Sequence, residues 1–316
     1  MNIILIRSNK RKNSTTYNSA EYLISKLENV DKVYEFTLPE DMPHICCGCY
    51  ACIKGDEEKC GGYKYLKPIL DAFDDSSLII FCSPVYVGHI PGQIKSFLDH
   101  FGYRWLVHRP DFKMLKKRAV IIASAGGGGL KATVKDIKDS MDYWGVARTY
   151  SVCQGVWGYF WDNMPDKFKN SLLKKLDKTA RKINKTSEKV TMSLKVKMLY
   201  TMFSKLHLKR KMTNVDDEYW IEKYKTEGER MKIKKVVSGL LALSIAVGSM
   251  YVVSAKDQYV TRGQVADMLL IAADDYNPNV KKEDIIQGYE DGELHEDWNV
   301  TRAEALVMLK RAFGKM

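Results

Sequence analysis

The sequence has none of the motifs that mark the common nucleic-acid-binding proteins. Zinc-finger spacing, a basic zipper and an RNA-binding aromatic signature are all lacking. The excess of 50 lysines and arginines over 39 aspartates and glutamates therefore does not indicate a nucleic-acid partner. An N-terminal signal peptide is lacking too, so we expect the first part of the chain in the reducing cytoplasm. The 21 glycines and 8 prolines among 316 residues are too few for a broadly disordered chain.

The net charge of +11 is unevenly distributed along the chain. Residues 257–316 contain twelve acidic and seven basic residues and carry −5, so the preceding residues carry +16. Such an asymmetry, in a chain long enough for about two domains, indicates units with different surroundings. We expect a first domain over residues 1–228, an apolar segment over 231–255 and a small module over 257–316.

Apolar runs and helical periodicities alternate through the first domain. Strands are expected over residues 2–7, 32–38, 77–82, 119–124 and 147–153. Amphipathic stretches follow each of them, the last being a long basic helix over 166–190. This alternation predicts an α/β three-layer sandwich with a five-stranded parallel sheet between helices. Because such sheets bind ligands outside the carboxyl ends of their strands, the loops after the first, third and fourth strands are the candidate site.

Two of these loops have compositions suited to a phosphate and a flat ring. The first offers hydroxyls, an amide and a cation just before a helix, whose N-terminus binds anions, through Ser8, Lys10, Asn13, Ser14, Thr15 and Thr16. It lacks the Gly-x-Gly-x-x-Gly of dinucleotide folds, and an ordinary capped helix start is an equal alternative. The fourth-strand loop lets a backbone approach closely at Ser124, Ala125, Gly126 and Gly127. A plain flexible turn is the alternative there.

The third-strand loop carries a more specific pattern. Its residues are Ser83, Pro84, Val85, Tyr86, Val87 and Gly88, followed by Pro91, Gly92 and Lys95. With the first loop, this segment resembles NAD(P)H-dependent FMN reductases over residues 2–154. The resemblance implies a flavodoxin-like fold, FMN held by the three loops, NAD(P)H as hydride donor, a small acceptor such as a quinone, flavin or aromatic compound, and a homodimer. Flavin chemistry needs positioning rather than a side-chain acid or base, so we predict no catalytic residue.

Five of the seven cysteines lie within residues 46–60. The spacing of Cys46, Cys49, Cys52 and Cys60 resembles that of iron–sulfur flavoproteins, which implies a [4Fe–4S] cluster that passes single electrons to a redox protein. Zinc, which usually takes separated cysteine pairs, and a redox disulfide are alternatives. The run from Cys46 to Cys52 also resembles a branch of FMN reductases that has no clear need of a cluster.

The C-terminal part has a different character. Residues 231–255 have a basic start, an apolar core and small residues at the end, in the order of a secretory signal or a membrane span, with a buried helix as the alternative. A span over 236–253 would leave the flavin domain inside the cell and the module outside. Residues 257–316 resemble an S-layer homology module, through the segments beginning at Thr261 and Thr301. That resemblance implies a small all-α module in which Arg262 and Arg302 face an anionic cell-wall polysaccharide. Because a cytoplasmic flavin domain joined to an exported module is unusual, we suspect a fusion of two adjacent reading frames.

Overall fold

The computed structural model describes residues 1–185, 190–209, 214–227, 261–273 and 281–286, and the short stretches 295–297, 300–301, 304–305, 307–308 and 311. The chain divides into two compact units, Met1–Glu229 and Arg230–Met316.

The first unit is built on a parallel sheet of five strands in the order β2-β1-β3-β4-β5. The strands are β1 (Asn2–Arg7), β2 (Lys32–Thr37), β3 (Leu78–Pro84), β4 (Arg118–Ala125) and β5 (Arg148–Gly155). Each lies within two residues of the predicted bounds, so the five-stranded parallel α/β sheet is confirmed. Because the chain leaves β1 for β2 and then returns to the other side of β1 as β3, the strand order reverses between β1 and β3. Ligands of such sheets bind at this reversal.

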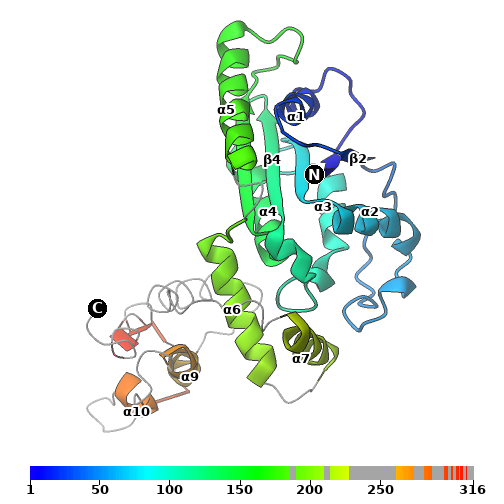
Figure 1. Ribbon diagram of the computed structural model, residues 1–316. Coiled ribbons are helices and arrows are strands. Elements are labelled where there is room, and N and C mark those ends of the chain that lie inside the picture. The colour runs from blue at the N-terminus through cyan, green and yellow to red at the C-terminus, as the bar shows by residue number, and fades with distance from the viewer. Residues whose placement is uncertain are drawn as a thin grey trace. The chain divides into compact units, whose positions relative to one another are not determined.

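Alternate residues of the apolar strands feed two separate cores, because successive side chains point to opposite faces of a sheet. Ile3 and Leu5 pack under α1 (Thr15–Ser25) and α5 (Asp166–Lys185). Ile4 and Ile6 pack under α2 (Tyr63–Asp75), α3 (Gly92–Asp99) and α4 (Leu130–Tyr143). Helices therefore cover both faces (Figure 1).

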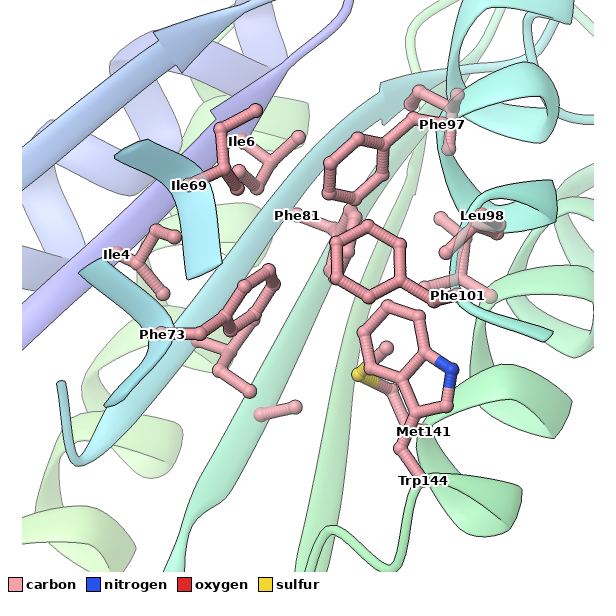
Figure 2. Packing of buried hydrophobic residues seen from close by; sticks show 14 of the residues in the cluster. Ile4, Ile6, Ile69, Phe73, Phe81, Phe97, Leu98, Phe101, Met141 and Trp144 are labelled. Carbon is pink, nitrogen blue, oxygen red and sulfur yellow. The ribbon is translucent and has the colours of Figure 1, made fainter. Parts of the chain in front are cut away.

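The second of these cores is rich in aromatic rings (Figure 2). Phe101 packs against Trp144 with ring centroids 4.8 Å apart, and Phe73 meets Trp144 edge to face at 5.8 Å. Offset and edge-to-face pairs of this kind add about 0.5–1.5 kcal/mol each beyond the area they bury. This core fixes α3 and α4, and with them the loops that precede both helices.

Two further helices, α6 (Leu194–Lys209) and α7 (Val215–Glu227), complete the first unit. The Ser193 N–H donates to the carbonyl of Ala147, the residue before β5, at 2.7 Å. This contact places the start of α6 at the amino end of the sheet. The fully buried Trp220 of α7 donates from its indole nitrogen to the His108 carbonyl at 2.7 Å. These helices therefore lie toward the edge opposite the candidate ligand loops.

The second unit includes α9 (Arg262–Ala273) and the short α10 (Lys282–Ile285). Arg262, expected to face a polysaccharide, is instead only 6% exposed, and its guanidinium lies 2.6 Å from the Glu304 carboxylate. That expectation was wrong for Arg262, because the cation is used inside the unit. Arg302 and residues 231–255 lie outside the described part, so the polysaccharide contact of Arg302 and the signal or membrane segment stay predictions. Across the residues that can be described, no helix is long and apolar enough to span a bilayer.

Candidate functional site

The loop after β1 leads into the N-terminus of α1 at the carboxyl edge of the sheet. Ser14 caps the helix by accepting from the Tyr17 N–H at 3.5 Å, and no acidic residue lies in the first turn. The backbone N–H groups at Thr15 and Thr16 head the helix, where the helix dipole favours an anion. The hydroxyl-bearing residues Ser8, Ser14, Thr15 and Thr16 are all buried, whereas Lys10 is exposed and pairs with Glu40 at 3.8 Å. Asn13 is half-buried.

The loop after β3 forms a tight hairpin. Tyr86 and His89 exchange two backbone hydrogen bonds, of 2.9 and 3.0 Å, and both intervening residues have positive φ, 47° at Val87 and 83° at Gly88. Positive φ at both central residues is the signature of a type I′ turn. A β-branched residue such as Val87 rarely adopts this conformation, so the turn holds local strain. The Val85 N–H donates to the Ser124 carbonyl at 2.8 Å, which ties the hairpin to the end of β4.

The glycine run after β4 has one closed and one open part. Gly129 has φ of +91°, and a Cβ added there would lie 2.6 Å from the Gly88 carbonyl oxygen and 2.6 Å from Val85 Cγ1. A Cβ added at Gly126, Gly127 or Gly128 would meet nothing within 4 Å. The loops after β3 and β4 therefore interlock at Gly129 and leave an unobstructed backbone edge beside it, of the kind that a flat ring can approach.

Comparison with known proteins identifies the family. The sequence profile described as NADPH-dependent FMN reductase matches residues 1–158. The chain belongs to this family. It is accordingly an NAD(P)H-dependent FMN oxidoreductase.

Three solved structures that are similar to this chain are oxidoreductases or reductases by their descriptions. An NADH:FMN oxidoreductase in its apo form is 22% identical with a TM-score of 0.44, over 61% of this chain and 95% of that one. An azoreductase from Bacillus anthracis str. Sterne is 15% identical with a TM-score of 0.44, over 58% and 99% of the two chains. An NAD(P)H:quinone oxidoreductase from Methanothermobacter marburgensis is 15% identical with a TM-score of 0.43, over 60% and 97%. No curated protein matches the chain.

The residues of this FMN reductase suit its cofactor. The N-terminus of α1 offers backbone donors without an opposing carboxylate, which suits a phosphate group. The open edge at Gly126–Gly128 suits a planar ring. Gln93 of α3 donates from its side chain to the Ser8 carbonyl at 2.8 Å. This bond joins the loop after β1 to the helix that follows the loop after β3. The sheet thus brings the three predicted loops to one edge.

A fourth loop at this edge escaped the sequence analysis. The residues after β5 include three exposed aromatic side chains, Trp157, Tyr159 and Phe160. The Trp161 N–H donates to the Asn13 carbonyl at 3.4 Å, and Arg11 lies over the Phe160 ring at 5.2 Å, so this loop covers part of the first one. The signal available in the sequence was the run of aromatic residues directly after a predicted edge strand.

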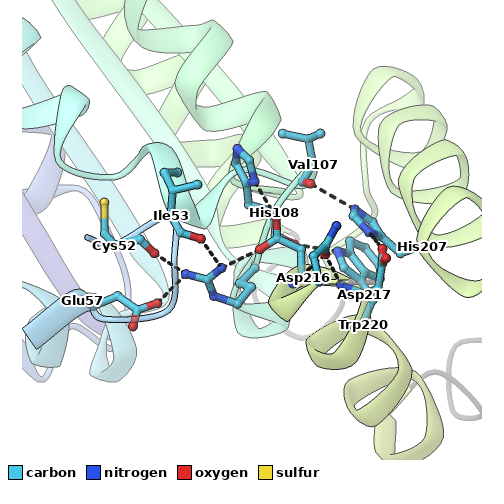
Figure 3. A network of polar contacts seen from close by, with 11 residues as sticks. Cys52, Ile53, Glu57, Val107, His108, His207, Asp216, Asp217 and Trp220 are labelled. Carbon is cyan, nitrogen blue, oxygen red and sulfur yellow. Dashed lines mark hydrogen bonds and ion pairs between the residues drawn. The ribbon is translucent and has the colours of Figure 1, made fainter. Parts of the chain in front are cut away.

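The cysteine-bearing loop is anchored away from the loops that follow β1, β3 and β4. The buried guanidinium of Arg109 donates to the carbonyls of Cys52 and, at 3.1 Å, of Ile53, and lies 2.8 Å from the Glu57 carboxylate of the short helix η1 (Glu57–Lys59). It also pairs with Asp216 of α7 at 2.5 Å (Figure 3). Arg109 follows closely on Leu106, whose N–H bonds the Tyr143 carbonyl at the C-terminal end of α4. Helix C-termini lie at the amino ends of parallel strands, so this anchor is opposite the flavin loops.

The four predicted metal ligands lie on the loop between β2 and α2, and one of them, Cys60, contacts a histidine. Cys60 Sγ lies 3.8 Å from His100 Nδ1, and His100 Nε2 donates to the His44 carbonyl at 3.0 Å, so in the neutral ring Nδ1 accepts from the thiol. Burial lowers the pKa of His100, which favours this neutral ring. Burial and the neighbouring Cys60, Cys46 and Cys49 raise the pKa of Cys52. Within the described part of the chain, no group of three or more His, Cys, Asp or Glu side chains could hold a metal ion.

Polar pairs beside the same anchor fix α7. Burial opposes ionisation of Asp216, but the hydrogen bonds and charges of His108 and Arg109 outweigh it and lower the pKa of this carboxyl. The fully buried Asp217 lies 2.6 Å from His207 Nδ1 of α6, and His207 Nε2 donates to the Val107 carbonyl at 3.0 Å (Figure 3). Trp220 stacks on the His207 ring with centroids 5.5 Å apart. These contacts hold α6 and α7 in place. The positions of these residues in the sequence did not indicate that they would meet.

Proposed function

We propose that this FMN reductase binds FMN at the carboxyl edge of the sheet and passes the electrons of NAD(P)H to a small planar acceptor. The first loop would hold the phosphate through the N-terminus of α1 and the side chains of Ser8, Lys10, Asn13, Ser14, Thr15 and Thr16. The ring would lie between the hairpin residues Ser83, Pro84, Val85, Tyr86, Val87 and Gly88 and the edge formed by Ser124, Ala125, Gly126 and Gly127. FMN, when bound, supplies the hydride chemistry, accepting from the nicotinamide and giving to the acceptor.

One observation carries this placement: the interlocked and open parts of the glycine run. The contact between Gly129 and Gly88 fixes the spacing of the two loops, and Gly126–Gly128 leave free space directly beside that contact. Backbone N–H groups exposed at this edge would point at the ring without obstruction by side chains, and would stabilise negative charge on the reduced flavin. An acceptor such as a quinone, free flavin or another flat aromatic compound could then stack on the uncovered face.

Alanine at Gly127 tests the placement. We expect Gly127→Ala to fold like the parent protein but to bind FMN at least tenfold more weakly, because the added methyl would occupy space that the ring needs. Gly102→Ala is the matched control, since a Cβ there also meets nothing within 4 Å but Gly102 lies in η2 (Gly102–Arg104), after α3 and away from the flavin loops. FMN titration followed by quenching of flavin fluorescence gives both affinities. Equal affinities would contradict the placement, whereas a parent protein that binds no FMN would contradict the function itself.

A second candidate function is a single-electron relay through a [4Fe–4S] cluster to a redox protein. It is supported by the closeness of Cys46, Cys49 and Cys60 to Cys52, whose pKa they help to raise. The arrangement of the thiols and the distant anchor at Arg109 count against it. Iron and acid-labile sulfide assays on anaerobically purified protein decide the matter, because a [4Fe–4S] centre would give about four irons per chain.

The remaining predictions from the sequence are proposals as well. The flavin domain is proposed to end near residue 228, supported by the packing of Trp220 and Asp217 inside the first unit. A homodimer and an S-layer homology module over residues 257–316 are proposed from resemblance alone. Sedimentation of the intact chain tests the first of these two, and an export assay tests the second.

A further inference from the structure

One face of α5 carries a concentration of unpaired positive charge. We call it the lysine face: Lys167, Lys174, Lys175 and Lys178, which with Asn170 and Ser171 line a shallow groove of about 560 Å³. Their spacing of three to four and seven residues places them on one side of the helix. The opposite side, with Leu172, Leu176, Ala180 and Ile183, is buried in the core. The helix as a whole has eight basic and two acidic residues.

On three other helices of the same unit, a lysine pairs with an aspartate of its own helix. Lys67 pairs with Asp71, Lys95 with Asp99, and Lys135 with Asp139, each four residues further along its helix. On α5, the residue four after Lys174 is Lys178, another cation. Like charges at this spacing cost an isolated helix about 0.2–0.5 kcal/mol per pair. Among the described residues, Lys167, Lys174 and Lys178 have no acidic partner, so the face is left uncompensated.

The lysine face adjoins the flavin edge. Lys175 donates to the Cys153 carbonyl at 2.8 Å and to the Gln154 side-chain oxygen at 3.1 Å, and Gln154 pairs in register with Ser124 of the proposed flavin site. β5 is the outer strand of the sheet, and α5 packs against it. The loop that leads into α5 carries the exposed Trp157, Tyr159 and Phe160. Exposed aromatic side chains therefore lie in the loop that joins β5 to the helix carrying the lysine face.

This combination fits a protein partner. Protein interfaces have aromatic anchors near their centre and charged groups at their rim, and opposite charges steer partners together and raise association rates by 10- to 1000-fold. We propose that the lysine face and the loop over residues 157–160 dock an acidic electron-carrier protein, which takes electrons from the bound flavin. This inference rests on the proposed function. One NAD(P)H supplies two electrons as hydride, so two one-electron carriers are reduced for each NAD(P)H oxidised, and one proton is released.

Charge reversal on the FMN-loaded full chain tests the proposal. The variant is Lys167→Glu/Lys174→Glu/Lys178→Glu, and the control is Lys54→Glu/Lys64→Glu/Lys116→Glu, which makes the same change of net charge at exposed lysines on other elements. The probes are two one-electron haem proteins, the acidic cytochrome b5 and the basic cytochrome c, together with an uncharged quinone. We expect kcat/KM for cytochrome b5 to fall at least tenfold in the first variant and its salt dependence to flatten, with the cytochrome c rate not lowered and the quinone rate unchanged.

Each outcome decides between alternatives. A fall of equal size in both triple variants, or no fall in the first, overturns the proposal. Binding of the parent protein to vesicles with 20% phosphatidylserine, lost in the first variant while cytochrome b5 reduction is kept, also overturns it and assigns the face to a membrane surface. If the parent protein reduces neither the quinone nor a cytochrome, it is the proposed function that fails. Quinone reduction without any reduction of cytochrome b5 leaves the function standing and overturns only the docking surface.

Discussion

Replacing Gly129 with alanine should destabilise the flavin unit by about 2–5 kcal/mol. Gly129 has φ of +91°, and holding an alanine in the left-handed region costs roughly 1–2 kcal/mol. The new Cβ would also lie 2.6 Å from both the Gly88 oxygen and Val85 Cγ1, and 2.8 Å from Gly88 Cα. Two of these three atoms belong to backbone that the type I′ hairpin holds in place. Overpacking of this kind typically costs about 1–3 kcal/mol more.

Urea unfolding of the FMN-free protein, followed by circular dichroism, measures the loss. The matched control is Gly128→Ala, one residue earlier, where the Cβ meets nothing within 4 Å and φ lies outside the left-handed region. We expect the control to lie within about 0.5 kcal/mol of the parent protein, as surface substitutions usually do. The interlock of the two loops is refuted if Gly129→Ala is as stable as Gly128→Ala.

Three further predictions concern buried charges of the same unit. Asp217→Asn should cost about 3 kcal/mol in urea unfolding, because it breaks a buried pair and leaves His207 facing an amide. Arg109→Lys should cost about 2 kcal/mol by the same assay although the charge is kept, since one ammonium cannot replace a guanidinium that contacts two carbonyls and two carboxylates. Burial lowers the pKa of Lys117 from 10.5 to about 8. Between these values the unfolded chain binds the extra proton, so stability rises with pH; relative to Lys117→Met, the parent protein should gain up to about 3 kcal/mol from pH 8 to 10.5.

The sheet and its ligand edge could be predicted from the sequence for a simple physical reason. Strands buried on both faces are nearly continuous apolar runs, as in the segment Leu78–Pro84, and parallel strands gather all their carboxyl ends at one edge. The loops that follow β1, β3 and β4 must then meet. Nothing in this inference required knowledge of any side-chain contact.

Contacts between distant residues could not be predicted in the same way. Arg109 and Asp216 are 107 positions apart in the sequence, and Cys60 and His100 are 40 positions apart. Nothing in the sequence around one residue of such a pair indicates which distant residue it contacts. The spacing of the cysteines suggested a single centre, but the thiol of Cys60 faces an imidazole from α3. Arg262 illustrates the same limit, since a cation expected at a surface is used inside its own unit.

α3 accounts for the separation between the flavin loops and the cysteine loop. Gln93, in its first turn, holds the Ser8 carbonyl at the carboxyl edge, and His100, at its C-terminal end, holds Cys60. Seven residues of helix at 1.5 Å per residue span about 10 Å, so the two loops are fixed to opposite ends of one short rod. Because Phe97 of this helix is fully buried in the aromatic core, the rod cannot shorten or tilt without disrupting that core. Any group bound by Cys60 would therefore lie at the other end of α3 from the loop that Gln93 holds, and it could not share the phosphate site proposed at the N-terminus of α1.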